Sequence, residues 1–146
     1  MKNSRGVTLI ELAIVLGIIT IVAAGIFVST RSSYYRDLQN ASLMLQSDLR
    51  YAQRRAIMEG RRYGVVFEVT ENRYHVVLDN PQETIRTVQF QNGVQLHSTS
   101  GPRLTFTPRG TASGGFRITL HNGSYSQQLT ATVSGGRIRI FDIEPR

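Results

Sequence analysis

The 146-residue sequence contains no cysteine and no tryptophan, and its only lysine is Lys2. Without cysteine, the chain forms neither disulfides nor thiolate metal sites, and thiol catalysis is excluded. The three histidines lie more than 20 residues apart and lack the paired spacing of metal ligands. We therefore interpret His75, His97 and His121 as ordinary strand residues and expect no metal site.

The sequence also lacks the motifs of a nucleotide-binding protein or an enzyme. The glycine-rich segment 110–115, GTASGG, has no lysine to reach a phosphate group. No pattern of nucleophile and base stands out along the chain. We therefore expect a protein that is not an enzyme and that carries no cofactor.

Positive charge is abundant and comes almost entirely from arginine. The formal net charge is +7, and from Arg31 onward 15 arginines and 9 acidic residues leave +6. Guanidinium groups suit forked contacts with carboxylates and phosphates. The alternative interpretation is a solvated surface that uses arginine.

An apolar run over residues 7–30 dominates the N-terminus, and Glu11 is its only ionisable residue. About 20 apolar residues in a helix suffice to cross a bilayer, and the positive flank of Lys2 and Arg5 predicts a cytoplasmic N-terminus. The sequence therefore predicts an extracytoplasmic segment from Arg31 onward. A secretory signal peptide or a plain signal anchor is the alternative.

Neither alternative explains Glu11. An acidic residue inside a membrane costs about 2.5 to 3.5 kcal/mol at the centre and less near an end, so it indicates a function. If the chain were cut between Gly6 and Val7, the new α-amino group of one subunit would be a cation for Glu11 of a neighbour, which removes the cost of burying two separate charges.

The segment Arg5-Gly6 followed by Val7-Thr8-Leu9-Ile10-Glu11 and a long apolar helix resembles a type IV prepilin. The resemblance implies that a prepilin peptidase cuts after Gly6 and methylates Val7, which stands where phenylalanine or methionine is usual. It also implies that Glu11, the fifth mature residue, pairs with the N-terminus of a neighbouring subunit.

Beyond residue 30 the pattern predicts one globular head, residues 31–146. Apolar residues at steps of three and four predict an amphipathic helix over about 34–59 that stops at Gly60: Leu38, Ala41, Leu45, Leu49, Ala52 and Ala56. This helix continues the one that starts at Val7, unless the serines and threonine near Ser29 to Ser33 break it into two.

From residue 61 to 143 the period changes to two and turn signals recur, which predicts short strands. The expected strands are Tyr63–Val69, Arg73–Asp79, Thr84–Phe90, Val94–His97, Arg103–Thr107, Phe116–His121, Gln127–Val133 and Arg137–Ile143. The sequence therefore predicts an α+β, pilin-like fold with one long N-terminal helix packed on an antiparallel sheet head.

Three stretches resemble the GspH/FimT branch of the pilin superfamily: residues 45–57, the Phe-x-Pro-x-Gly element within 104–112, and residues 136–140. The resemblance implies a minor pilin or pseudopilin of a type II secretion pseudopilus or a type IV pilus. It implies a single-pass protein of the bacterial inner membrane whose partners are other pilin subunits and the prepilin peptidase. The sequence does not distinguish the kind of filament, or a tip position from a shaft position.

The second hypothesis is DNA binding. Arg137 and Arg139 alternate with Ile138 and Ile140, so both arginines point to one side of a strand, where they can track phosphates. Gly136 to Arg139 also resembles the C-terminal Gly-Arg-x-Arg element of FimT-type proteins implicated in DNA uptake. The alternative is structural: the isoleucines face the core while the arginines are solvated or pair with Asp142 and Glu144.

Overall fold

The computed structural model describes residues 8–79 and 81–145. The chain divides into two compact units, Met1–Ser33 and Tyr34–Arg146. One helix, α1 (Leu9–Glu59), contributes residues to both units. The structure thus assigns a single helix where the sequence left open a break near Ser29 to Ser33.

In the first unit, Thr8 caps the start of α1. Its carbonyl oxygen accepts the backbone N–H groups of Glu11 and Leu12, each at 3.1 Å, and its hydroxyl oxygen lies 3.4 Å from the Glu11 nitrogen. Further along, the Thr20 hydroxyl donates to the Gly17 carbonyl at 2.8 Å, so this polar side chain is satisfied inside its own helix. Among the described residues, no helical segment combines the length and apolarity needed to cross a bilayer.

In the second unit, α1 presents the apolar face that its periodicity predicts. The buried side chains on this face are Leu38, Leu45, Leu49, Ala52 and Ala56. The helix ends at Glu59, and Gly60 follows with a positive φ of 62°, which confirms the predicted stop.

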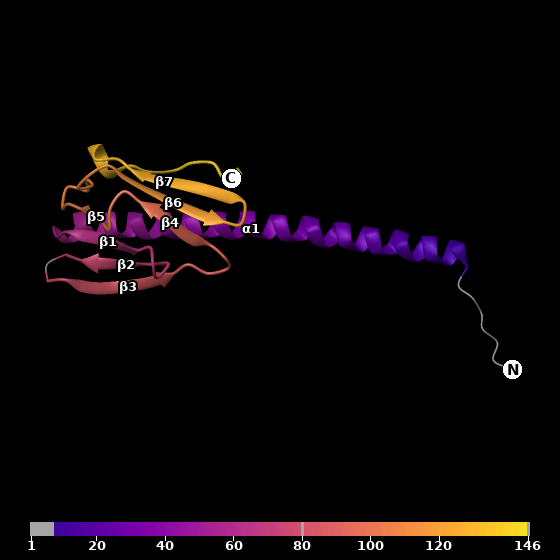
Figure 1. Cartoon of the computed structure of the whole chain (residues 1–146). Coiled ribbons are helices and arrows are strands. Elements are labelled where there is room, and N and C mark those ends of the chain that lie inside the picture. Colours follow the sequence, from indigo (N-terminus) through magenta and orange to yellow (C-terminus); the bar gives the residue numbers. More distant parts are fainter. Residues whose placement is uncertain (1–7, 80, 146) are drawn as a thin grey trace. The chain divides into compact units, whose positions relative to one another are not determined.

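Within the described residues, the helix is followed by strands β1 (Tyr63–Glu68), β2 (Arg73–Leu78), β3 (Glu83–Gln89), β4 (Gln95–Thr99), β5 (Arg103–Phe106), β6 (Phe116–Asn122), β7 (Tyr125–Ala131), β8 (Ile138–Ile140) and β9 (Glu144–Pro145). They form two antiparallel sheets in the orders β3-β2-β1-β5 and β4-β6-β7-β8, with β9 paired to β7 (Figure 1). The short 3₁₀ helix η1 (Ser134–Gly136) precedes β8. The predicted fold class is confirmed.

One hydrophobic core joins α1 to both sheets. Phe67 of β1 and Phe116 of β6 stack across the two sheets with ring centroids 5.4 Å apart. Asn72, in the turn between β1 and β2, links the sheets through polar contacts. Its amide nitrogen donates to the Val94 carbonyl at 2.9 Å, and its side-chain oxygen accepts the Leu96 N–H at 2.7 Å.

The predicted strand over Arg137–Ile143 is wrong in its extent. The structure has three-residue β8 and, after an interruption, two-residue β9, and the two pair with different parts of β7. At Phe141 the backbone N–H still donates to the Gln128 carbonyl at 2.9 Å, but the Phe141 carbonyl accepts a side chain. The buried Gln127 of β7 donates its amide N–H to the Phe141 carbonyl at 3.0 Å, and Phe141 lies between the two strands.

Candidate functional site

The predicted cleavage and methylation residues, Gly6 and Val7, lie outside the described residues. Glu11 is described, and its side chain is exposed in the first turn of α1. A carboxylate there is favourable, because the N-terminal end of a helix carries partial positive charge. Thr8 and Glu11 also have the spacing of a capping box, a local signal that our sequence analysis did not consider. The contacts from Thr8 account for the Glu11 backbone N–H, and the Glu11 side chain is exposed.

The helix around Glu11 exposes large apolar side chains on all its sides. These side chains are 47 to 87% exposed in the isolated chain: Leu9, Ile10, Leu12, Ile14, Val15, Leu16, Ile18, Ile19, Ile21 and Val22. A helix that is apolar all round is stable only when lipid or other helices surround it. This composition makes residues 9–22 a candidate site for contact with lipid or with other helices.

Arg137 and Arg139 lie at the other candidate site. Arg139 is in β8, Arg137 is the residue between η1 and β8, and both are exposed. Ile138 between them is buried and Ile140 is half-buried, so the predicted alternation holds. Within residues 8–79 and 81–145 no ion pair joins either arginine to Asp142 or Glu144.

The register of the sheet adds a further arginine to this face. Arg139 of β8 pairs with Thr130 of β7, and Thr130 pairs with Arg117 of β6. Paired residues point to the same face of a sheet, so Arg117, Thr130 and Arg139 form a row across three strands. Arg117 is not among the residues predicted from the sequence, because strand register cannot be obtained from the spacing of residues along the chain.

The structure also brings together two histidines that the sequence keeps apart. The rings of His97 in β4 and His121 in β6 stack with centroids 4.1 Å apart and an interplanar angle of 16°. His97 occupies a β-bulge between Leu96 and Ser98. Among the described residues no group of three or more potential metal ligands includes this pair.

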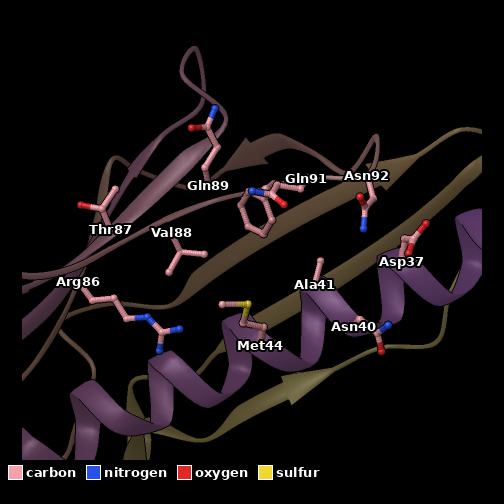
Figure 2. Close-up of a pocket in the computed structure, with 11 residues that line it drawn as sticks. Asp37, Asn40, Ala41, Met44, Arg86, Thr87, Val88, Gln89, Gln91 and Asn92 are labelled. Carbon is pink, nitrogen blue, oxygen red and sulfur yellow. The ribbon is translucent and has the colours of Figure 1, made fainter.

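A groove of about 430 Å³ lies between α1 and the edge strand β3 in the second unit. Ala41 and Met44 face Val88 across it, and Arg86 and Asp37 stand at its two ends (Figure 2). Its other lining residues are mostly amides and hydroxyls, namely Asn40, Thr87, Gln89, Gln91 and Asn92. None of the site residues predicted from the sequence lies in this groove.

Arg86 fixes one end of that groove through a buried carboxylate. The Arg86 guanidinium donates to one Asp48 carboxylate oxygen at 2.8 Å, and the Tyr74 hydroxyl donates to the other at 2.7 Å. The Asp48 side chain is 6% exposed, whereas that of Arg86 is 50% exposed. Burial, and then the hydrogen bond to Asp48, raises the pKa of the Tyr74 hydroxyl above its ordinary value.

Comparison with known proteins identifies the family. The model described as type II transport protein GspH matches residues 42–136, and that of the prokaryotic N-terminal methylation motif matches residues 1–27. No curated protein sequence matches significantly.

Two solved structures have a similar fold. The minor pseudopilin EpsH from the type 2 secretion system of Vibrio cholerae is 16% identical, with a TM-score of 0.63 over 72% of this chain and 96% of that one. The type IV minor pilin FimU of Pseudomonas aeruginosa is 19% identical, with a TM-score of 0.62 over 73% of this chain and 90% of that one.

The GspH match covers more than half of the chain and lies in the second unit, while the methylation motif covers the N-terminus that carries Glu11. The chain therefore belongs to the GspH family of type II transport proteins, and it is a structural subunit of the pilin and pseudopilin class, not an enzyme.

Proposed function

We propose that this chain is a minor subunit of a type II secretion pseudopilus or a type IV pilus. In this proposal, prepilin peptidase cuts between Gly6 and Val7 and methylates Val7, and residues 7–30 hold the subunit in the inner membrane before assembly. The segment then exchanges lipid for neighbouring helices, and Glu11 pairs with the α-amino group of an adjacent subunit.

One observation carries this proposal: an exposed carboxylate stands in the first turn of a helix whose apolar side chains over residues 9–22 are exposed on every side. Moving such a helix from lipid to a helix bundle gains little hydrophobic free energy, so packing and specific polar contacts must favour assembly. Glu11 is the one ionisable residue in the segment that can make such a contact.

The test is Glu11→Gln, which keeps the size of the side chain and removes its charge. An ammonium group left unpaired in an apolar bundle costs about 3 kcal/mol or more, so incorporation into sheared filaments should fall by roughly a hundredfold or more. The matched control is Glu71→Gln, in the exposed turn between β1 and β2. Undiminished incorporation of the Glu11 variant, at equal membrane levels, would exclude the pairing.

A second candidate function is binding of DNA during uptake. The observation that favours it is that Arg137 and Arg139 are exposed and form no ion pair within the described part of the chain. Unpaired guanidinium groups are available for phosphates, and their contacts are independent of base sequence.

The DNA test uses the full chain purified in a non-ionic detergent. Replacing both Arg137 and Arg139 by glutamine should weaken DNA binding at least tenfold and lower the salt slope of log Kd by about 2, because two phosphate contacts are lost. The control replaces Arg62, which precedes β1, and Arg73 in β2, so that the charge changes equally at the other sheet. Equal affinities of the two double variants would contradict a site at Arg137 and Arg139.

A further inference from the structure

Gln53 of α1 joins two turns that are far apart in the sequence. Its amide nitrogen lies 2.7 Å from the Gly110 carbonyl oxygen, 3.2 Å from that of Gly136 and 3.4 Å from that of Gly135. Two N–H donors are thus shared among three acceptors. We call this contact, made of Gln53, Gly110, Gly135 and Gly136, the glutamine junction.

At two of the three glycines of the glutamine junction, Gly110 and Gly136, no space is left for a side chain. A Cβ atom at Gly136 would lie 2.2 Å from the Gly110 carbonyl oxygen and 2.4 Å from the Gln53 amide nitrogen. A Cβ atom at Gly110 would lie 2.7 Å from the Ile57 side chain. The two turns therefore hold a definite position against the C-terminal end of α1, which is also where Figure 1 places η1.

Each element of the glutamine junction carries an exposed arginine next to it. Arg109 precedes Gly110, and Arg137 follows Gly136. On the helix, Arg50 and Arg54 are one turn apart on the exposed side of Gln53, opposite the buried flank of Leu49, Ala52 and Ala56.

Arg137 connects this group of arginines to the row of Arg139, Thr130 and Arg117 on the outer face of the sheet. From Arg137 the surface passes to Arg139 and across Thr130 to Arg117, two strand spacings or about 10 Å away. None of these side chains has an ion pair or a side-chain hydrogen bond within residues 8–79 and 81–145: Arg50, Arg54, Arg109, Arg117, Arg137 and Arg139.

We propose that these arginines form one binding surface for the phosphodiester backbone of a nucleic acid, and that Gln53 is its positioning residue. The inference rests on the second candidate function and enlarges its site from two arginines to a line of arginines from α1 to β6. Charge complementarity selects the ligand: uncompensated guanidinium groups spread along a line match a chain with a regular series of phosphates, each of which accepts a forked contact.

In this arrangement Gln53 contacts no phosphate. It holds the turn of Arg109 and the turn of Arg137 against α1, so that arginines from three separate elements face the same ligand. Losing Gln53 should weaken binding because the arginines are less well positioned, whereas the number of phosphate contacts at saturation changes little.

The experiment measures Kd for fluorescently labelled DNA at several salt concentrations, with the full chain in a non-ionic detergent. Replacing Arg54 and Arg109 by glutamine should raise Kd at least tenfold and lower the salt slope by about 2. Gln53→Met, which keeps the length of the side chain and removes its donors, should raise Kd about threefold to tenfold with a nearly unchanged slope. Its matched control, Gln39→Met on the exposed face of α1, should bind as the unmodified chain does.

Each outcome decides a separate point. If the Arg54 and Arg109 variant binds within twofold of the unmodified chain while the Arg137 and Arg139 variant is weakened, the extended surface is wrong and DNA binding at the two-residue site stands. If the unmodified chain binds no DNA at low salt, both ideas are wrong, and the filament role is still judged by Glu11→Gln. Tighter, equally arginine-dependent binding to vesicles of phosphatidylglycerol would overturn the nucleic acid as ligand.

Discussion

At Gly136 a single added methyl group would collide with the backbone of another turn. The residue has a φ of +57°, and a Cβ atom would lie 2.2 Å from the Gly110 carbonyl oxygen. Both features disfavour a side chain, one through backbone strain and the other through overlap. The Gly-Arg-x-Arg element was identified from the sequence by resemblance alone. The structure supplies a physical reason for the glycine at its first position.

We predict that Gly136→Ala lowers the free energy of unfolding by about 2 to 4 kcal/mol, from strain and overpacking together. Urea titration of a fragment of residues 34–146, which contains the whole hydrophobic core, measures the change. Gly114→Ala is the matched control, because a Cβ atom there meets no atom within 4 Å. Similar losses in the two variants would show that the close approach at Gly136 is unimportant.

The buried Asp48 carboxylate depends on Arg86 for its charge balance. We predict that Arg86→Gln destabilises the same fragment by about 2 kcal/mol, less than for a fully buried pair because Arg86 is half-exposed. Arg73→Gln breaks the pair with Glu68, in which both side chains are more than a third exposed, and should cost less than about 1 kcal/mol. Denaturant midpoints of the two variants provide the comparison, and equal shifts would contradict this ranking.

The buried Tyr74 hydroxyl should make the free energy of unfolding depend on pH. Its pKa is raised in the folded protein, so above pH 10, the ordinary value, the unfolded chain loses this proton while the folded chain keeps it. The Tyr74 contribution is therefore fully present below pH 10 and declines above it, by about 1.4 kcal/mol per pH unit. Stability curves between pH 9 and 11 should lose this component in Tyr74→Phe but keep it in Tyr35→Phe, whose ring is exposed.

Among the elements, α1 in the second unit shows the clearest division between a buried face and an exposed one. Leu45 is fully buried, and Leu43, two residues earlier in the same helix, is 51% exposed. We predict that Leu45→Ala lowers the free energy of unfolding by about 3 kcal/mol through lost burial and a cavity, and that Leu43→Ala changes it by less than about 0.5 kcal/mol. Thermal and urea unfolding check both values, and a large loss at Leu43 would place that residue in an unrecognised contact.

The edge strand β3 is the element that least resembles its neighbours. Six of its seven residues are exposed and only Val88 is buried, so the strand borders the groove with polar and charged side chains. Glu83 and Arg86 on such an edge oppose pairing with the edge of another sheet. The predicted strand Thr84–Phe90 agrees with β3 within one residue at each end. Its place at the edge of the sheet is known only from the structure, in which β3 pairs with β2 alone.

For the molecule as a whole, the proposed cleavage after Gly6 and methylation of Val7 can be tested directly. Mass spectrometry of the protein from cells should show an N-terminus at Val7 that carries one methyl group, with the apolar segment retained. In the proposed processing, cleavage follows Gly6, so a Gly6→Val variant should keep residues 1–6 and accumulate outside filaments. An uncut chain in assembled filaments, or loss of the entire apolar segment, would contradict the proposed filament role.

Local patterns along the chain were enough to predict most of the secondary structure and the fold class. The apolar run, the three-and-four spacing from Leu38 to Ala56 and the alternation after residue 61 predict α1, nearly all the strands and the α+β class, because hydropathy and backbone preference act between near neighbours. The motif around Glu11 likewise predicted the N-terminal methylation motif, and three later stretches predicted the GspH family.

Contacts between distant residues required the folded chain. Gln53 and Gly136 are 83 residues apart, and Tyr74 and Asp48 are 26 apart, so no spacing rule links them. The same holds for the stacked histidines, the row from Arg117 to Arg139 and the division of the last predicted strand into β8 and β9. Each depends on strand register and on the packing of α1 against two sheets, and these are set by the total burial of the core rather than by any single segment.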